Sequence, residues 1–292
     1  MTCPPSAAAN PERVQALIEA LPYIRRFSGK TVVVKFGGSL LEDAAIQQTV
    51  IQDIAMLKLV GIEPVLVHGG GPAMTSLLTQ LQKESTFVQG YRVTDAETLA
   101  VAEMVLSGKI NKSLVAALHQ QGMRAVGLSG QDGAMITVKK RHIEGVDMGF
   151  EGEVTAVDVA LARTLMGHDF IPVISPIGID TDGQAYNLNG DAVAVALAVA
   201  LQAEKLIFLT DVCGVLRDLA DAGSRISRLR AEQAPEFIDS GVIHGGMIPK
   251  VNSCVEAVTQ GVGSVHILDG RITHAILLEI FTDQGLGTMV TP

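Results

Sequence analysis

Short aliphatic runs alternate with amphipathic stretches along most of this 292-residue chain. The runs are rich in Val, Ile and Leu and predict buried strands, whereas the stretches repeat apolar residues every three or four positions and predict helices. The expected strands are 31–36, 64–67, 170–175, 205–210, 264–268 and one near Thr288. The expected helices are 46–57, 73–82, 94–106, 112–121, 160–166, 191–202, 231–238, 248–260 and 274–281. This alternation predicts an α/β fold, a three-layer αβα sandwich with a mainly parallel, open central sheet.

Two segments depart from the alternation. Residues 125–154 combine short strand-like runs with glycine pairs, which predicts hairpins on one edge of the sheet. Ahead of the first strand, Asn10 and Pro11 open an extra N-terminal helix whose apolar residues recur at helical spacing, and Pro22 is expected to kink or end it. The apolar face of this helix packs either on its own domain or on a partner subunit, and the pattern leaves both open.

Composition narrows the functional classes. Hydrophobic residues make up 48% of the chain and aromatic residues 4%, so the core is expected to be aliphatic. The formal net charge of −9 argues against a nucleic-acid-binding protein, which would carry a basic excess. The longest apolar run, 192–201, is far shorter than the ~20 residues of a membrane span. The first ten residues lack the pattern of a secretory signal, and we expect a cytoplasmic protein without membrane partners.

Glycine-rich turns follow the first two expected strands. Gly37-Gly38 ends one strand and 69–71 ends the next, and a helix begins after each turn. Glycine lets backbone N–H groups approach a ligand closely, and a helix N-terminus favours anions, so the two turns together could cradle a phosphate or a carboxylate. Either turn could also be a plain strand-to-helix connection. No G-x-G-x-x-G occurs here, so a dinucleotide site is not supported.

Two lysines stand at unusual positions. Lys35 lies at the end of a hydrophobic strand, where a charge is costly unless it reaches an anion. Lys250 lies at the opening of an expected helix, where a cation opposes the helix dipole unless a bound anion compensates. Each lysine could equally extend its ammonium group into solvent.

Six motifs occur in the order found in the amino-acid kinase family, which the chain resembles over almost its whole length. The motifs are VVVKFGGS (32–39), VLVHGGGP (65–72), GYRVTDAET (90–98), NLNGDAVA (187–194), LTDVCGVLRD (209–218) and GGMIPKV (245–251). RVTDAET and GGMIPKV resemble the branch of the family that phosphorylates N-acetyl-L-glutamate. The resemblance implies ATP-dependent phosphorylation of the side-chain carboxylate in arginine biosynthesis, with Mg²⁺ carried by the nucleotide. Glutamate 5-kinase, another amino-acid kinase, or a non-catalytic arginine-sensing protein of the same fold are the alternatives.

The same resemblance implies roles for individual residues. The catalytic residues would be Lys35 and Lys250, which flank the transferring phosphoryl group, and Asp191, which orients them. The acetylglutamate would contact Gly70, Gly71, Arg92 and Asn187, with Arg92 on the α-carboxylate. The nucleotide would contact Gly37, Gly38, Gly69, Thr210, Asp211, Gly214 and Leu216. Because a carboxylate nucleophile is already ionised at pH 7, positioning and charge neutralisation suffice and no general base is needed. The chain departs from the usual family pattern at Ala73, Gly190 and Glu151.

The N-terminal helix resembles the extra helix of arginine-inhibited, hexameric members, in which such helices join dimers into a trimer of dimers. The resemblance implies an L-arginine site between that helix and the C-terminal region, formed by Tyr23, His274, Glu279 and Gly287. It divides the chain into an oligomerisation helix (1–28), an N-lobe for acetylglutamate binding and dimerisation (29–180) and a C-lobe for ATP (181–292). Regulation by a PII-type signalling protein is left open.

Overall fold

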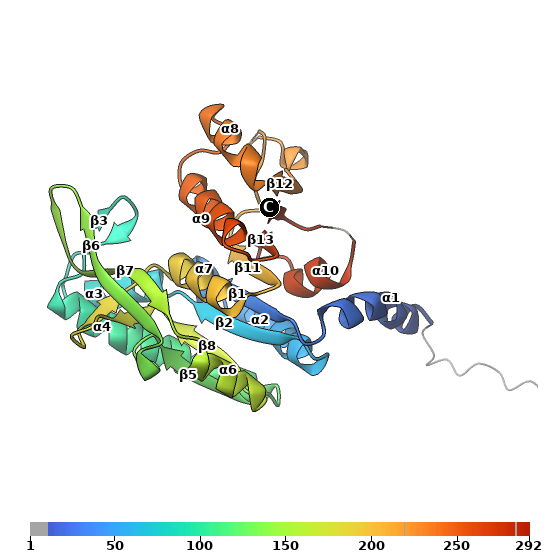
Figure 1. The fold of residues 1–292 in the computed structure, drawn as a ribbon, viewed down its shortest axis with the longest axis horizontal. Coiled ribbons are helices and arrows are strands. Elements are labelled where there is room, and N and C mark those ends of the chain that lie inside the picture. The colour runs from blue at the N-terminus through green and yellow to red at the C-terminus, as the bar shows by residue number, and fades with distance from the viewer. Residues whose placement is uncertain (1–10, 219, 284) are drawn as a thin grey trace, which may run out of the picture.

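An eight-stranded sheet forms the centre of the molecule, with helices on both of its faces (Figure 1). The computed structural model describes residues 11–292 apart from 219 and 284. In spatial order the sheet contains β12 (Arg228–Arg230), β14 (Thr288–Thr291), β13 (Ser264–Asp269), β11 (Lys205–Thr210), β1 (Thr31–Phe36), β2 (Glu63–His68), β8 (Ile171–Ser175) and β5 (Ala125–Ser129). Neighbouring strands are parallel except β13 and β14, which are antiparallel. The αβα sandwich with a mainly parallel sheet is therefore confirmed.

Strand β1 lies where the strand order reverses. The chain continues from β1 to β2 on one side, and β11 of the C-terminal half pairs with β1 on the other side. Alternate residues of β1 serve the two faces: Val33 belongs to one apolar core, and Val32 and Val34 belong to the other. In an open parallel sheet, such a reversal leaves a crevice beyond the carboxyl ends of the strands, and this is where ligands bind.

Helices cover the two faces separately. The helices are α1 (Pro11–Phe27), α2 (Ala44–Leu59), α3 (Gly71–Gln80), α4 (Ala96–Ala102), α5 (Asn111–Gln120), α6 (Ala160–Gly167), α7 (Gly190–Leu201), α8 (Ala234–Asp239), α9 (Met247–Thr259) and α10 (Ala275–Phe281). The core containing Val33 is built with α6, α7, α8 and α9, and the opposite core is built with α2, α5 and α10. Helix α7 carries the 192–201 run because it packs on the main sheet and on strand β7 (Val146–Val157) at once. No helix in the described part of the chain could span a membrane.

A second, smaller sheet lies beside the central one. Strands β6 (Ile136–Ile143), β7, β9 (Ile177–Ile179) and β10 (Ala185–Asn187) pair with one another in a closed set. A short hairpin of β3 (Phe87–Val88) and β4 (Tyr91–Arg92) lies near it (Figure 1). The sequence correctly predicted a hairpin within 125–154 but wrongly assigned it to the edge of the main sheet. That edge is β5, and the chain leaves the main sheet at the turn after Ser129, so β6 and β7 pair only within the smaller sheet.

Local signals at several element ends were misread. Helix α1 continues through Pro22 to Phe27, because the carbonyl that proline leaves unbonded, that of Ile18, lies on an exposed stretch where water can bind it. The helix expected from 94 begins later: the N-cap of α4 is Asp95, which accepts a hydrogen bond from the Thr98 amide, and Thr94 before it is fully buried. A π-helical turn, Glu103–Ile110, joins α4 to α5 without the expected break. The expected cap Asn10 lies outside the described residues.

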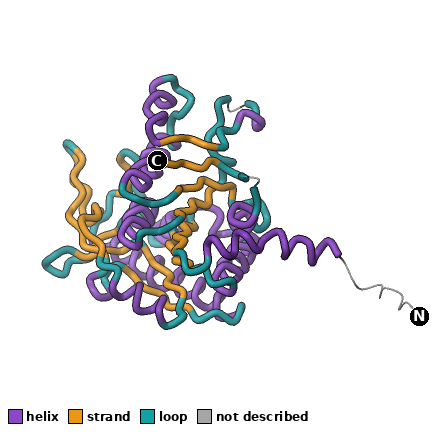
Figure 2. Tube along the Cα trace, turned by 45° about the vertical axis from the view of Figure 1, so that its right-hand side comes forward, coloured by secondary structure: helices purple, strands orange, loops and turns teal. Residues whose placement is uncertain are grey.

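Helix α1 projects from the body of the molecule (Figure 2). Its apolar side chains are largely exposed: Val14, Leu17, Ile18 and Leu21. Its C-terminal end joins the core, where Phe27 is 4% exposed and the partly buried Tyr23 packs against the same cluster. The expected lobe boundary, between 180 and 181, lies in the turn between β9 and β10, which pair as a hairpin. The division into lobes stays a prediction.

Candidate active site

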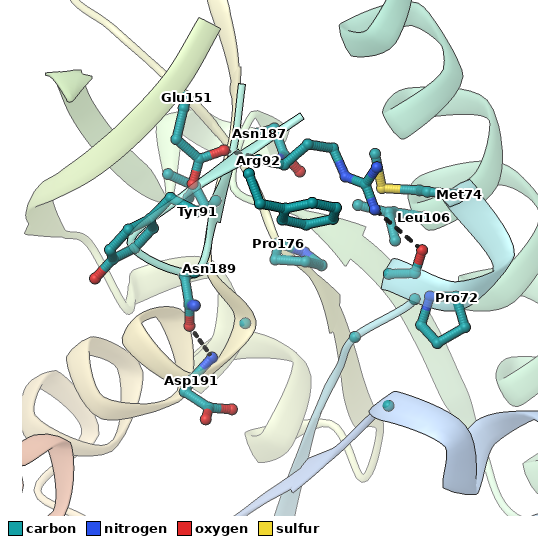
Figure 3. A pocket seen from close by; sticks show the side chains of 18 of the residues that line it. Pro72, Met74, Tyr91, Arg92, Leu106, Glu151, Pro176, Asn187, Asn189 and Asp191 are labelled. Carbon is teal, nitrogen blue, oxygen red and sulfur yellow. Dashed lines mark hydrogen bonds between the residues drawn. The ribbon is translucent and has the colours of Figure 1, made fainter. Parts of the chain in front are cut away.

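A pocket of about 260 Å³ opens at the carboxyl end of β1, at the reversal of strand order (Figure 3). Its floor combines the glycine turns after β1 and β2 with the N-terminus of α7. Its opposite wall comes from β4, β7 and β10, which supply Arg92, Glu151 and Asn187. The pocket therefore joins segments that are far apart in the chain.

Two lysines meet on one carboxylate at the edge of this pocket. Lys35 Nζ lies 2.7 Å from Asp191 Oδ1, and Lys250 Nζ lies 2.7 Å from Asp191 Oδ2. Lys35 comes from the end of β1, and Lys250 comes from the first turn of α9. Burial alone raises the pKa of Asp191, but the charges of Lys35 and Lys250 outweigh burial and hold this pKa well below its ordinary value. The trio thus carries one net positive charge at pH 7.

The start of α7 fixes the position of Asp191. The side chain of Asn189 caps the helix by accepting a hydrogen bond from the amide of Asp191 at 2.8 Å (Figure 3). It accepts a second hydrogen bond from the amide of Ala192 at 3.2 Å. This cap holds the first turn so that the carboxylate points to the end of β1. The sequence placed both lysines and Asp191 in one site, and the structure brings all three together.

The two glycine turns touch each other beside Lys35. A Cβ at Gly37 would lie 2.9 Å from Lys35 Nζ and 3.2 Å from the Gly69 Cα. A Cβ at Gly70 would lie 2.5 Å from side-chain carbons of Leu106 and Ile110. Side chains are therefore excluded on steric grounds, and the backbone of the turns faces the pocket directly. Of the glycines predicted for these two turns, Gly38, Gly69, Gly70 and Gly71 line the pocket, whereas Gly37 lies behind them against Lys35 and Gly69.

Arg92 brings a buried positive charge to the opposite wall. It is 6% exposed, and its guanidinium lies 4.5 Å above the Phe87 ring. Its Nη2 donates to Thr75 Oγ1 at 2.9 Å and to the Gly71 carbonyl at 3.2 Å, and its Nη1 donates to Ser85 Oγ. Arg92 forms no ion pair with any residue that the structure describes. A buried guanidinium held only by neutral groups is suited to bind a carboxylate.

Asn187 lies beside Arg92 and contacts an acid. Its Nδ2 donates to Glu151 Oε2 at 2.7 Å, and the two residues are partners in the β7–β10 register. Glu151 is 1% exposed. Burial raises the pKa of Glu151 to about 7, against the opposing effects of the Asn187 hydrogen bond and of Arg141 and Arg92.

Four of the positions predicted for the nucleotide lie at or after the end of β11, which is next to β1 in the sheet. Thr210 Oγ1 bonds the backbone of Val212, and Asp211 is exposed beyond the strand. Gly214 has a φ of +113°, and a Cβ there would lie 2.7 Å from Thr288 Oγ1, so packing alone requires this glycine. Leu216 forms an isolated bridge with Arg225. Their contact with a nucleotide stays a prediction.

The four positions predicted for arginine have separate partners. Tyr23 donates to Asp283 at 2.5 Å, and His274 Nδ1 lies 2.6 Å from Asp53. Glu279 lies 2.7 Å from His266 Nδ1, in a buried group with Lys205. A Cβ at Gly287 would collide with the Ile267 carbonyl. Within the described part of the chain, no hydrogen bond or ion pair joins any two of these four residues, although α1 does pack on α10.

Two residues near the site were missed from the sequence. His68 is fully buried; its Nδ1 lies 2.8 Å from the Gly69 carbonyl, and its Nε2 lies 3.2 Å from Asn111. Burial lowers the pKa of His68 to about 4, so it is neutral at pH 7 and braces the glycine turn. Its place directly before the three glycines was an available signal. The second is Glu151, noticed only as a departure from the family pattern.

Comparisons with known proteins agree with this geometry. A profile of the amino acid kinase family matches residues 30–269. Acetylglutamate kinase of Moorella thermoacetica is 52% identical over 289 residues, covering 96% of this chain and 98% of the relative. Acetylglutamate kinase of Nostoc sp. is 52% identical over 282 residues, covering 97% and 94%.

Solved structures are similar too. N-acetylglutamate synthase of Neisseria gonorrhoeae, complexed with coenzyme A and N-acetyl-glutamate, has a TM-score of 0.85 and 30% identity, covering 96% of this chain and 63% of that chain. Carbamate kinase of Giardia lamblia bound to AMP-PNP has a TM-score of 0.66 at 15% identity, covering 90% and 98%, and supports the fold alone. With the family profile and the near full-length relatives, these likenesses establish that the chain belongs to the amino acid kinase family.

Proposed function

We propose that the chain transfers the γ-phosphoryl group of ATP to the side-chain carboxylate of N-acetyl-L-glutamate. The observation that carries this proposal is a pocket with Lys35 and Asp191 at one end and Arg92, whose described partners are all neutral, at the other. Lys250 meets the same Asp191 carboxylate from the adjoining cavity. A substrate with two carboxylates needs both ends: one carboxylate is held, and the other reacts. The names of relatives about half identical to this chain support the same substrate.

The substrate's α-carboxylate would pair with Arg92 in bidentate fashion. Asn187 would offer its amide, and the N–H groups of Gly70 and Gly71 at the start of α3 would face the reacting carboxylate. That carboxylate needs no base, since its ordinary pKa is about 4.3. The chain would therefore act by holding the carboxylate nucleophile in line with the transferring phosphoryl group. The reaction would take place beside the glycine turns, in a space from which side chains and water are excluded.

Lys35 and Lys250 would contact the phosphoryl oxygens from opposite sides. Their charge would offset the repulsion between two anions, and Asp191 would keep both ammonium heads turned toward the pocket. The nucleotide would lie over the C-lobe (181–292) with Thr210, Asp211, Gly214 and Leu216, and Gly37, Gly38 and Gly69 would donate to its phosphates. The steric exclusion at Gly37 fits a cradle for phosphates. ATP supplies the phosphoryl group when bound.

Mg²⁺ would be bound through the phosphates. Both oxygens of Asp191 already face lysines, and Glu151 is buried on the opposite wall, so the pocket offers the ion no free pair of carboxylates. No cluster of three potential metal ligands occurs in the described part of the chain.

We also propose a hexamer, a trimer of dimers, inhibited by L-arginine, in a cytoplasmic enzyme. The support is the exposed apolar face of α1, which a second copy of that helix would cover. The arginine site would lie where α1 meets α10, the helices that carry Tyr23 and Glu279. His274 and Gly287 are held by other contacts and would act there only indirectly.

The test is incubation with Mg-ATP and N-acetyl-L-glutamate, with hydroxylamine present to trap an acyl phosphate. The proposal expects a hydroxamate from N-acetyl-L-glutamate and little from glutamate. The reverse preference would favour glutamate 5-kinase. No hydroxamate from a folded protein that binds arginine would favour a non-catalytic sensor.

A further inference from the structure

Glu151 is an acid in a pocket that we assign to an anion. It lines the same cavity as Arg92 and Asn187, and it is 1% exposed. Figure 3 shows its carboxyl group above Tyr91, on the wall that also carries Arg92 and Asn187. The proposed substrate would bring two further negative charges into this space. A negative Glu151 would therefore oppose the binding that Arg92 favours.

The hydrogen-bond partners of Glu151 are neutral and do little to hold a charge on it. The short hydrogen bond to Oε2 comes from the neutral amide of Asn187. Thr94 Oγ1 lies 3.5 Å from Oε2 and 3.0 Å from the Arg92 carbonyl, so its single proton goes to the carbonyl. Glu151 forms no ion pair with a residue that the structure describes, although it is an acid on a strand next to Arg141.

The charged groups around it come from four elements. Arg92 of β4 and Arg141 of β6 attract a negative charge at Glu151. Asp191 of α7 is held between its two lysines. Asp95, the N-cap of α4, pairs with Lys83 at 2.6 Å. Arg92 lines the pocket in which we place the ligand, and a carboxylate bound to it would neutralise its attraction for Glu151.

We propose that Glu151 is neutral when the anionic substrate is bound, so that binding takes up one proton and weakens as the pH rises. Resting on the function proposed above, the inference makes Glu151 a specificity-determining residue of that site. Its free-state pKa of about 7 means that the group is about half protonated near neutral pH. A second carboxylate nearby raises the pKa of Glu151 further in the complex, as in any pair of acids that share a site.

The size of the effect follows from linkage. The pKa of Glu151 is about 7 in the free protein, and in the complex it would lie above the pH range tested. The affinity for N-acetyl-L-glutamate should therefore fall about 30-fold between pH 6 and pH 8.5. The carboxylates of N-acetyl-L-glutamate titrate near pH 4, so the ligand contributes nothing in this range. Glu151→Gln keeps the shape and removes the titration.

Calorimetric titration of the nucleotide-free protein with N-acetyl-L-glutamate tests the inference. Wild type should lose about 30-fold in affinity from pH 6 to 8.5, and heats in HEPES and Tris should report uptake of about half a proton near pH 7, rising toward one at pH 8. E151Q should bind with little pH dependence and take up none. E153Q, on the same strand with a partly exposed side chain, is the matched control and should behave as wild type. An E151Q profile that follows wild type would overturn the inference, as would pH-independent binding by wild type.

The wild-type buffer comparison keeps the test decisive even if E151Q does not fold. Failure of this inference can be distinguished from failure of the proposed function. Binding that does not depend on pH, together with hydroxamate formation, rejects only the inference. Binding that depends on pH, without hydroxamate formation, rejects only the proposed reaction.

Discussion

Replacing Lys35 by Met tests the proposed role of the ammonium group while keeping most of the stem. Lys35 Nζ lies 2.7 Å from Asp191 and beside the Gly37 turn, and its side chain is 14% exposed. A unit charge acting at about 4 Å with an effective dielectric constant near 20 contributes about 4 kcal/mol. If that attraction develops mainly in the transition state, kcat falls about 10³-fold.

Substrate affinity should change much less. Lys250 and the backbone of the glycine turns remain to bind the phosphates, so the KM for ATP should rise no more than about tenfold. A coupled assay of ADP release gives both constants. Lys139→Met is the control, because the Lys139 side chain is 62% exposed and its one ion pair among the described residues is with Glu153, at 3.4 Å. A K35M enzyme that folds and loses kcat and affinity equally would refute the transition-state role.

Three further predictions concern other parts of the account. Arg92→Ala should raise the KM for N-acetyl-L-glutamate roughly 10²-fold, about 3 kcal/mol for a lost bidentate pair, with a smaller change in kcat; steady-state kinetics with an unchanged KM would contradict the assignment. Removing residues 1–21 keeps Tyr23 and the buried Phe27 but deletes the exposed apolar face of α1. Light scattering should then report dimers, and arginine inhibition should be lost. An unchanged oligomer would count against that interface. The folded-state pKa of Glu151, about 7, exceeds its unfolded value, 4.5, so its contribution to stability is present below pH 4.5 and declines as the pH rises to 7. Urea unfolding should therefore show wild type losing about 3 kcal/mol relative to E151Q between pH 4.5 and 8, and parallel curves would contradict this.

The sequence predicted best where one local pattern had a single structural solution. Strands 31–36 and 205–210 were predicted with the bounds observed, because short, mostly apolar runs buried on both faces fit the middle of a parallel sheet. Lys35 and Lys250 were suspected for the same reason: each charge is out of place unless it meets an opposite one. The structure supplies that charge, at Asp191.

Features set by distant contacts escaped prediction. The two short strands β9 and β10 make sense only as partners of β6 and β7. His274 has a left-handed φ of +57° and pairs with Asp53, 221 residues earlier, which no local pattern reveals. Thr94 has the chemistry of an N-cap, but its burial leaves the capping to Asp95.

The central claim is that two ammonium groups converge on one transferring phosphoryl group. A crystal structure with a non-hydrolysable ATP analogue and N-acetyl-L-glutamate tests it most directly. The account predicts that Lys35 Nζ and Lys250 Nζ both lie about 3 Å from oxygens of the γ-phosphate, with the substrate's α-carboxylate on Arg92. A closed complex in which either nitrogen faces another cavity would contradict it.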